Sequence, residues 1–121
     1  MTASVQRHLQ EPRIRLRYML LSEKWKELAA ASLNQDFIAD APLVIVIAAL
    51  YERTTKRYGE RGIRYVHIEV GHAGQNIYLQ SESLGLGTVA VGAFYDEEVA
   101  RVLNLPEDHE PLYVMPIGYV R

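Results

Sequence analysis

The segment Tyr58–Phe94 constrains the fold most, because it combines a long helical pattern, a glycine turn and an apolar run. Apolar residues recur in it at steps of three, four and seven, as one buried face of a helix requires. The residues of this face are Ile63, Val66, Val70, Ala73, Ile77 and Leu84. Gly85 can supply the left-handed cap that ends such a helix, and Thr88–Phe94 has the apolar pattern of a buried strand. The segment therefore predicts a helix, a turn and a strand in direct succession.

Two glycines interrupt the predicted helix. Gly71 and Gly74 stand in its middle, where a glycine costs about 1 kcal/mol relative to alanine. They indicate either the close approach of another backbone or of a flat ligand, or tight packing of the helix.

A second apolar run predicts the centre of a sheet. Leu43–Ile47 follows Pro42 and consists of five consecutive Leu, Val or Ile residues. Branched side chains are restricted in a helix but pack well in a sheet, so the run favours a central strand that is buried on both faces.

Weaker patterns predict the remaining elements. Residues 20–33 have the spacing of an amphipathic helix, and Tyr51–Tyr58 predicts a short polar helix. Asp96 is suited to cap a helix that ends at residue 103. Residues 111–120 predict a last strand, in which Pro116 indicates an edge position, a bend or a bulge.

The bulk properties exclude several classes of protein. The 121 residues fit one domain, residues 1–121, in which we expect residues 1–15 to be an extended lead-in. A net charge of -2 provides no field for nucleic acid or an anionic membrane, and the absence of cysteine excludes disulfides and thiolate metal sites. The longest apolar stretch, Ala41–Leu50, is about half of a membrane-spanning helix. We expect a soluble cytoplasmic protein.

The local motifs do not establish a reaction. Glu69 and His72 have the spacing of a Glu-x-x-His half-site, but the second half-site of a di-iron centre is missing, so we predict no metal. The glycines at 85, 87 and 92 follow a helix instead of a strand, which excludes a dinucleotide fingerprint. Tyr58 beside Arg57 is either an acid or base, or a packing residue.

Two stretches, taken in order, resemble the C-terminal part of the nitroreductase family and, within it, the SagB-type dehydrogenase branch. The stretches are RYGERGIRYVHIEVGHAGQNIYLQSESLGLGTVAVGAF and DEEVARVLNLPEDHEPLYVMPIGY. The resemblance covers residues 41–120, which would form the recognisable core of a single nitroreductase-like domain.

The resemblance implies an α+β fold in which a long buried helix covers a central sheet, assembled as an intertwined homodimer. It implies an FMN-dependent oxidoreductase that transfers hydride through flavin N5 between NAD(P)H or an organic substrate and an acceptor. The substrate would be a small molecule or a peptide, since the SagB-type branch includes azoline dehydrogenases that act on modified peptides.

The resemblance also assigns residues by position. Gly92 and Ala93 match the segment whose backbone N–H groups face flavin N5 and O4, where negative charge builds on reduction. The residues that match the central helix beside the flavin and the dimer seam are Gly71, His72, Gln75 and Asn76. Arg57 and Tyr58 match a catalytic Lys-Tyr couple, although an arginine cannot release a proton as a lysine can.

The chain departs from the family pattern at the phosphate site. The Arg-Ser-x-Arg segment that binds the FMN phosphate, and the Pro-Ser loop over the ring, are not visible in it. The candidate substitutes are Arg13, Arg15, Arg17 and Arg121. Two alternatives follow: a minimal flavin oxidoreductase or fragment that a second chain completes, and a dimeric binding or scaffold subunit without cofactor.

Overall fold

The structure of the chain is a computed structural model that describes residues 14–19 and 23–120. A four-stranded sheet forms its centre, with the strands in the order β1–β2–β4–β3 and each neighbouring pair antiparallel. The strands are β1 (Ile14–Met19), β2 (Leu43–Ala49), β3 (Leu86–Thr88) and β4 (Glu110–Tyr119). The helices are α2 (Glu23–Ala31), the short 3-10 helix η1 (Asp36–Ile38), α3 (Glu52–Tyr58), α4 (Arg61–Ser83) and α5 (Asp96–Val102).

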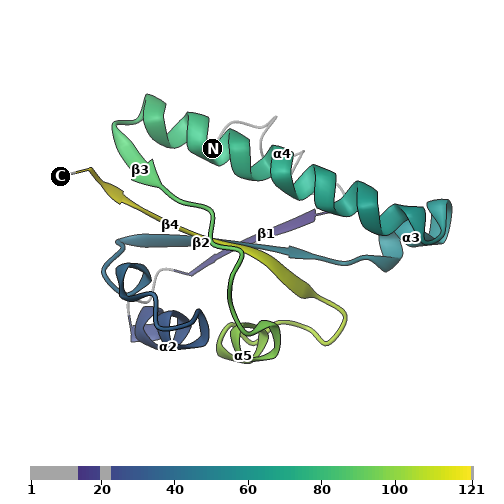
Figure 1. Cartoon of the computed structure of the whole chain (residues 1–121), viewed down its shortest axis with the longest axis horizontal. Coiled ribbons are helices and arrows are strands. Elements are labelled where there is room, and N and C mark those ends of the chain that lie inside the picture. Colours follow the sequence, from purple (N-terminus) through teal and green to yellow (C-terminus); the bar gives the residue numbers. More distant parts are fainter. Residues whose placement is uncertain (1–13, 20–22, 121) are drawn as a thin grey trace.

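Helices cover both faces of the sheet. The long helix α4 lies along one face, whereas α2 and α5 lie side by side against the other (Figure 1). One apolar cluster, which includes Trp25 and Val46, lies between the sheet and the pair of helices α2 and α5. A second cluster, which includes Ile47 and Val66, lies between the sheet and α4. The predicted α+β fold with a long helix on a central sheet is confirmed.

Strand β2 is the central strand that the apolar run after Pro42 predicts. It extends to Ala49 and pairs with β1 on one side and β4 on the other. Val44 and Val46 belong to the α2 and α5 cluster, whereas Ile47 and Ala49 belong to the α4 cluster. Because both faces are covered, β2 is apolar at every position instead of alternating.

Helix α4 confirms the long helical pattern, but only its central part is buried. Val66 and Val70 are buried against the sheet. The expectation that Ile63 and Leu84 share this face is wrong, because their side chains are 43% and 63% exposed. The first turn of α4 packs on α3 through Gly62, and Leu84 lies beyond the last helical residue.

The glycine turn after α4 is found where it is predicted, but the strand that follows is shorter. Gly85 has a φ of 71°, the left-handed conformation that favours glycine. The predicted strand Thr88–Phe94 is wrong in extent, because β3 ends at Thr88. Beyond it, the chain pairs with the sheet through one isolated bridge, between Val91 and Val114.

Pro116 lies inside the sheet, which corrects the expectation that it marks an edge, a bend or a bulge. Strand β4 pairs with both β2 and β3, and its register shift lies elsewhere, opposite Ile47 and Ala48. The Pro116 carbonyl accepts a 2.9 Å hydrogen bond from the Thr88 hydroxyl on the β3 side. The proline nitrogen, which has no hydrogen to donate, faces the same side. The backbone pairing of β4 with β3 covers Tyr119 to Ile117 and so stops next to Pro116.

The other predicted elements differ in detail. The helix predicted within residues 20–33 is α2, and the one predicted at Tyr51–Tyr58 is α3. Asp96 is the first residue of α5 and not its cap; Tyr95 precedes it without a side-chain cap. Residues 14–15 of the expected lead-in belong to β1, which the sequence pattern missed, and residues 1–13 lie outside the described residues.

Substituting Gly62 tests the contact between α3 and α4. In Gly62→Ala, the added Cβ would lie 2.9 Å from Thr55 Cα and 3.0 Å from the carbonyl carbon of Thr54, and backbone atoms cannot swing aside as a side chain can. We expect the variant to lose about 1–3 kcal/mol of unfolding free energy, measured by urea denaturation.

Gly71→Ala is the matched control on the same helix. Nothing lies within 4 Å of the Cβ that it adds, and the loss of a mid-helix glycine stabilises by up to about 1 kcal/mol. Equal unfolding free energies for the two variants would contradict the close contact at Gly62.

Candidate functional site

Residues 90–95, which we call the strap, follow β3 and lead past β4 to α5. The Ala90 N–H donates a 2.7 Å hydrogen bond to the Tyr78 hydroxyl on α4. Val91 exchanges two backbone hydrogen bonds with Val114 of β4, at 2.8 and 3.0 Å. The first half of the strap is therefore attached both to the helix and to the sheet.

The second half of the strap is attached to the segment around the end of α2. The Gln35 side chain donates one hydrogen bond to the Ser32 carbonyl at 2.8 Å and one to the Ala93 carbonyl at 3.0 Å. The Tyr95 N–H donates to the Ala31 carbonyl at 2.9 Å. The chain is thus fixed on both sides of residues 92 and 93.

Gly92 and Ala93 lie exposed between these attachments. Their backbone N–H groups donate no hydrogen bond to any residue that the structure describes. Two adjacent donors on a fixed support can bind a polar group of a ligand without first rearranging.

The ring of Tyr113, on β4, lies between the strap and α4. A Cβ added at Gly74 would lie 3.1 Å from this ring, and one added at Gly92 would lie 3.8 Å from it. Gly74 therefore makes room for an aromatic side chain, which is the tight packing that the sequence left as one alternative. Gly71 has no such neighbour, since nothing lies within 4 Å of its added Cβ.

The resemblance also assigns four other residues of α4 to the flavin. Gly71, His72, Gln75 and Asn76 are all exposed. No hydrogen bond joins them to the strap within residues 14–19 and 23–120. The structure therefore places Gly92 near the Tyr113 ring, which also contacts Gly74, and within the described residues it links none of these four residues to the strap by a hydrogen bond.

Arg57 and Tyr58 lie at the corner between α3 and α4, away from the strap (Figure 1). The Arg57 guanidinium carbon is 5.3 Å from the centroid of the Tyr58 ring. That ring meets the ring of Tyr65 edge-on, with 5.2 Å between centroids. Tyr58 is 40% exposed, so its side chain is accessible from solvent.

A second tyrosine forms a pair that the sequence analysis did not identify. The Tyr51 hydroxyl lies 2.6 Å from His67 Nε2, and the two rings meet edge-on. Partial burial raises the pKa of Tyr51, and the carboxylates of Glu110 and Asp96 raise it further. Sequence spacing gives no signal for this pair, because its members are 16 residues apart on different elements.

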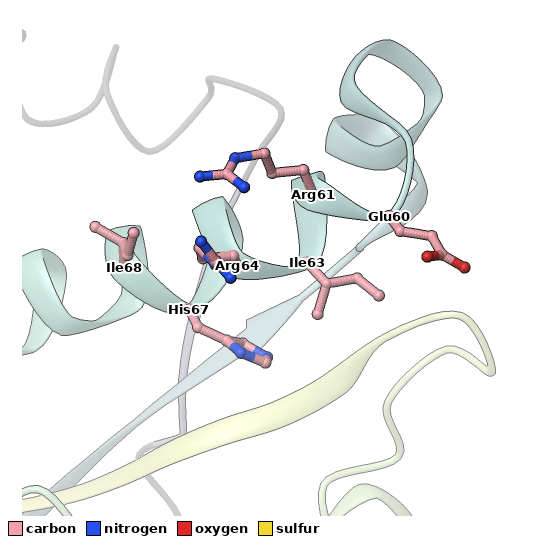
Figure 2. A pocket seen from close by; sticks show the side chains of 6 residues that line it. All are labelled: Glu60, Arg61, Ile63, Arg64, His67 and Ile68. Atoms are coloured by element: carbon pink, nitrogen blue, oxygen red, sulfur yellow. The ribbon is translucent and has the colours of Figure 1, made fainter.

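His67 also lines an open hollow of about 830 Å³ on the first two turns of α4. Its lining residues are Glu60, Arg61, Ile63, Arg64, His67 and Ile68 (Figure 2). The hollow thus combines two guanidinium groups, an imidazole and a carboxylate with two apolar side chains.

Neither a cluster of metal-ligating side chains nor a membrane-spanning helix is found in the described ranges, 14–19 and 23–120. No three His, Cys, Asp or Glu residues there are grouped as metal ligands would be. In the same ranges, no helix combines the length and the apolar character that crossing a bilayer requires.

Comparisons with known sequences give a consistent family. The profile described as Nitroreductase family matches residues 2–119. A Methanocaldococcus jannaschii protein provisionally named a nitroreductase is 59% identical over 100 residues, which are 83% of this chain and 50% of that protein. An NADPH-flavin oxidoreductase of Vibrio harveyi is 29% identical over 106 residues, 81% of this chain and 44% of that protein. The chain spans about half the length of the curated relatives it matches.

Solved structures share the fold. The Vibrio harveyi NADPH:FMN oxidoreductase complexed with NAD+ matches with a TM-score of 0.76 at 28% identity, over 92% of this chain and 51% of that one. A nitroreductase family protein of Clostridium novyi matches with a TM-score of 0.80, over 92% of this chain and 63% of that one. The latter is 19% identical, so this likeness shows the fold alone.

Tyr78→Phe tests whether α4 holds the strap. The substitution removes the acceptor of the partly buried Ala90 N–H, and leaving such a group unpaired costs about 1–3 kcal/mol. We therefore expect hydrogen exchange of the Ala90 amide, followed by NMR, to accelerate by about tenfold or more.

Tyr95→Phe is the control, because the Tyr95 hydroxyl makes no hydrogen bond to any described residue. An Ala90 amide that exchanges equally fast in the two variants would show that Tyr78 does not hold the strap.

Proposed function

The chain belongs to the nitroreductase family, and from this premise we propose that it is an FMN-dependent oxidoreductase. FMN, when bound, would supply hydride transfer through its N5 atom, with NAD(P)H or an organic substrate as the donor. The names of the Vibrio harveyi relatives, which refer to NADPH, flavin and FMN, support this class of activity.

The unpaired N–H groups of Gly92 and Ala93 are the observation on which the proposal depends. They are adjacent and exposed, and the hydrogen bonds of Ala90, Val91 and Tyr95 fix the backbone around them. Donors that are already in place stabilise developing negative charge without reorganising. We assign to Gly92 and Ala93 the binding of the polar edge of the flavin ring, at N5 and O4.

The α4 residues would complete the site from the helix side. Gly71, His72, Gln75 and Asn76 are exposed on two successive turns of α4, so they are available to a cofactor or to a second subunit. We propose that they border the flavin across a dimer seam, which is consistent with the absence of a hydrogen bond between them and the strap in the described residues.

A narrower proposal concerns the SagB-type dehydrogenase branch and its acid/base chemistry. In this proposal, the Tyr58 hydroxyl would act as the acid or base that exchanges a proton with the substrate, and Arg57 would hold the phenol in place. Support comes from the 5.3 Å contact of the Arg57 guanidinium with the Tyr58 ring and from the exposure of that ring. Arg57 remains charged throughout, so its role is electrostatic.

A second copy of the chain is the partner that we propose for the side of α4 facing away from the sheet. Steps of three and four residues define this outward face, as in a helix–helix seam. The outward face consists of Tyr65, Ile68, His72, Gln75 and Leu79. Ile68 and Leu79 are 49% and 60% exposed, and their burial would stabilise a homodimer.

Adding FMN to the purified chain tests the proposed function. Bound flavin should appear in the absorbance spectrum, and NADPH should bleach it. Ala93→Pro removes one donor, and we expect flavin reduction to slow by about 100-fold, as when an oxyanion-hole donor is lost.

Ala93→Ser retains the N–H group and should reduce flavin at the unmodified rate. Circular dichroism of both variants checks that they fold. Protein that stays colourless after FMN is added would reject the flavin enzyme in favour of a cofactor-less binding subunit.

Leu79→Glu tests the homodimer. A carboxylate at position 79 of the proposed seam would have to lose its water when the subunits meet, so we expect the mass by light scattering to fall from that of a dimer to that of a monomer. Gln80→Glu is the matched control, because Gln80 is exposed and lies about 100° around α4 from Leu79. A monomeric mass for the unmodified chain would contradict the proposed homodimer.

A further inference from the structure

The hollow on α4 has the size and composition of a ligand site, and no role has been assigned to it so far. Its volume of about 830 Å³ lies within the range of roughly 300–1,000 Å³ in which small-molecule sites fall. Arg61 and Arg64 contribute two positive charges and Glu60 one negative charge, so the lining is net positive. Its charge favours an anionic ligand.

The two arginines are available to such an anion. Arg61 donates through Nε to the Tyr65 hydroxyl at 3.2 Å, which orients its guanidinium while its terminal nitrogens stay available. Arg64 forms no ion pair in the part of the chain that the structure describes. A guanidinium fork matches the oxygens of a phosphate better than a point charge does.

His67 adds a third polar group, whose ring is held in place by a hydrogen bond. Its Nε2 atom is engaged by the Tyr51 hydroxyl at 2.6 Å. The imidazole tautomer decides which of the two groups donates in this hydrogen bond. In a neutral imidazole that accepts at Nε2, the other nitrogen, Nδ1, carries the hydrogen. In that tautomer, His67 can donate through Nδ1 to an oxygen of a ligand.

The apolar part of the lining restricts the ligand further. Ile63 and Ile68 are both exposed large side chains, and they lie on either side of Arg64 and His67 in sequence. A compound that joins a flat ring to an anionic group would cover these side chains and also meet the guanidinium groups. Nucleotides have both parts.

We propose that the α4 hollow binds the phosphate of a nucleotide, with Arg61, Arg64 and His67 as donors. The phosphate can come from FMN or from the nicotinamide dinucleotide. The choice of these two ligands rests on the proposed function. In either case Ile63 and Ile68 contact the apolar part of the ligand, and Glu60 weakens binding by repulsion.

Isothermal titration calorimetry with two probes tests this proposal. FMN represents the flavin, and ADP-ribose represents the dinucleotide without its redox-active ring. We expect Arg64→Gln to weaken binding of one probe by about tenfold or more, since a hydrogen bond to a charged group contributes about 1.5–3 kcal/mol. Glu60→Gln should strengthen binding of the same probe several-fold.

Arg64→Gln should weaken binding and Glu60→Gln should strengthen it. These opposite changes in affinity separate a charge effect from a loss of structure, because a damaged fold would weaken binding in both variants. Arg101→Gln on α5, on the far face of the sheet, is the control and should change neither affinity. Loss of ADP-ribose binding alone identifies the dinucleotide as the source, and loss of FMN binding alone identifies the flavin.

Other outcomes overturn the inference. If Arg64→Gln leaves both affinities unchanged, the hollow does not bind phosphate. If it changes only the mass in solution, the hollow is a subunit contact and not a ligand site. If ADP-ribose binds through Arg64 while the chain binds no FMN, the inference is supported and the proposed flavin enzyme is rejected. The two proposals can therefore fail separately.

Discussion

The contact between the Tyr113 ring and Gly74 sets the distance between α4 and the sheet. A Cβ at position 74 would lie 3.1 Å from the ring, so either the ring or the helix would have to shift by a few tenths of an ångström. The strap depends on this distance, because its first residues are bonded to Tyr78 on the helix and to Val114 on the sheet. The packing of Tyr113 on Gly74 therefore helps to position the exposed N–H groups of Gly92 and Ala93, although neither of these residues takes part in that contact.

The strap also explains how two donors can stay unpaired in an ordered segment. Nearly all backbone polar groups of folded proteins find partners, and a free loop would usually turn its N–H groups toward the protein. Here the carbonyl of Ala93 is bonded to Gln35, and the amides of Ala90, Val91 and Tyr95 have acceptors on three different elements. These bonds determine the course of the backbone, and the donors between them point where the chain offers no acceptor. A site supported in this way needs no rearrangement when a ligand arrives.

The parts of the fold that sequence predicted are those with local causes, and the parts it missed depend on distant partners. The apolar run of β2, the period of α4 and the turn at Gly85 are each visible within one window of sequence. The end of β3 is not, because it depends on Pro116 of another strand, almost thirty residues away. The same holds for Tyr51 and His67, whose pairing requires the start of α3, where Tyr51 lies, to be packed against α4 first. The assignment of Gly92 came from family resemblance and not from any local pattern.

Ile68 links the two proposed surfaces of α4, since it lines the hollow and also belongs to the outward face. At about 100° per residue, Ile63 lies about 140° around the helix from Ile68, so a subunit that covers Ile68 leaves the Ile63 side of the hollow open. A nucleotide and a second subunit would then meet at one side chain while occupying different sides of the helix. Binding of either would change the free energy of binding the other, and the factor must be the same in both directions. If both proposals hold, the affinity between subunits must therefore depend on the nucleotide that occupies the hollow.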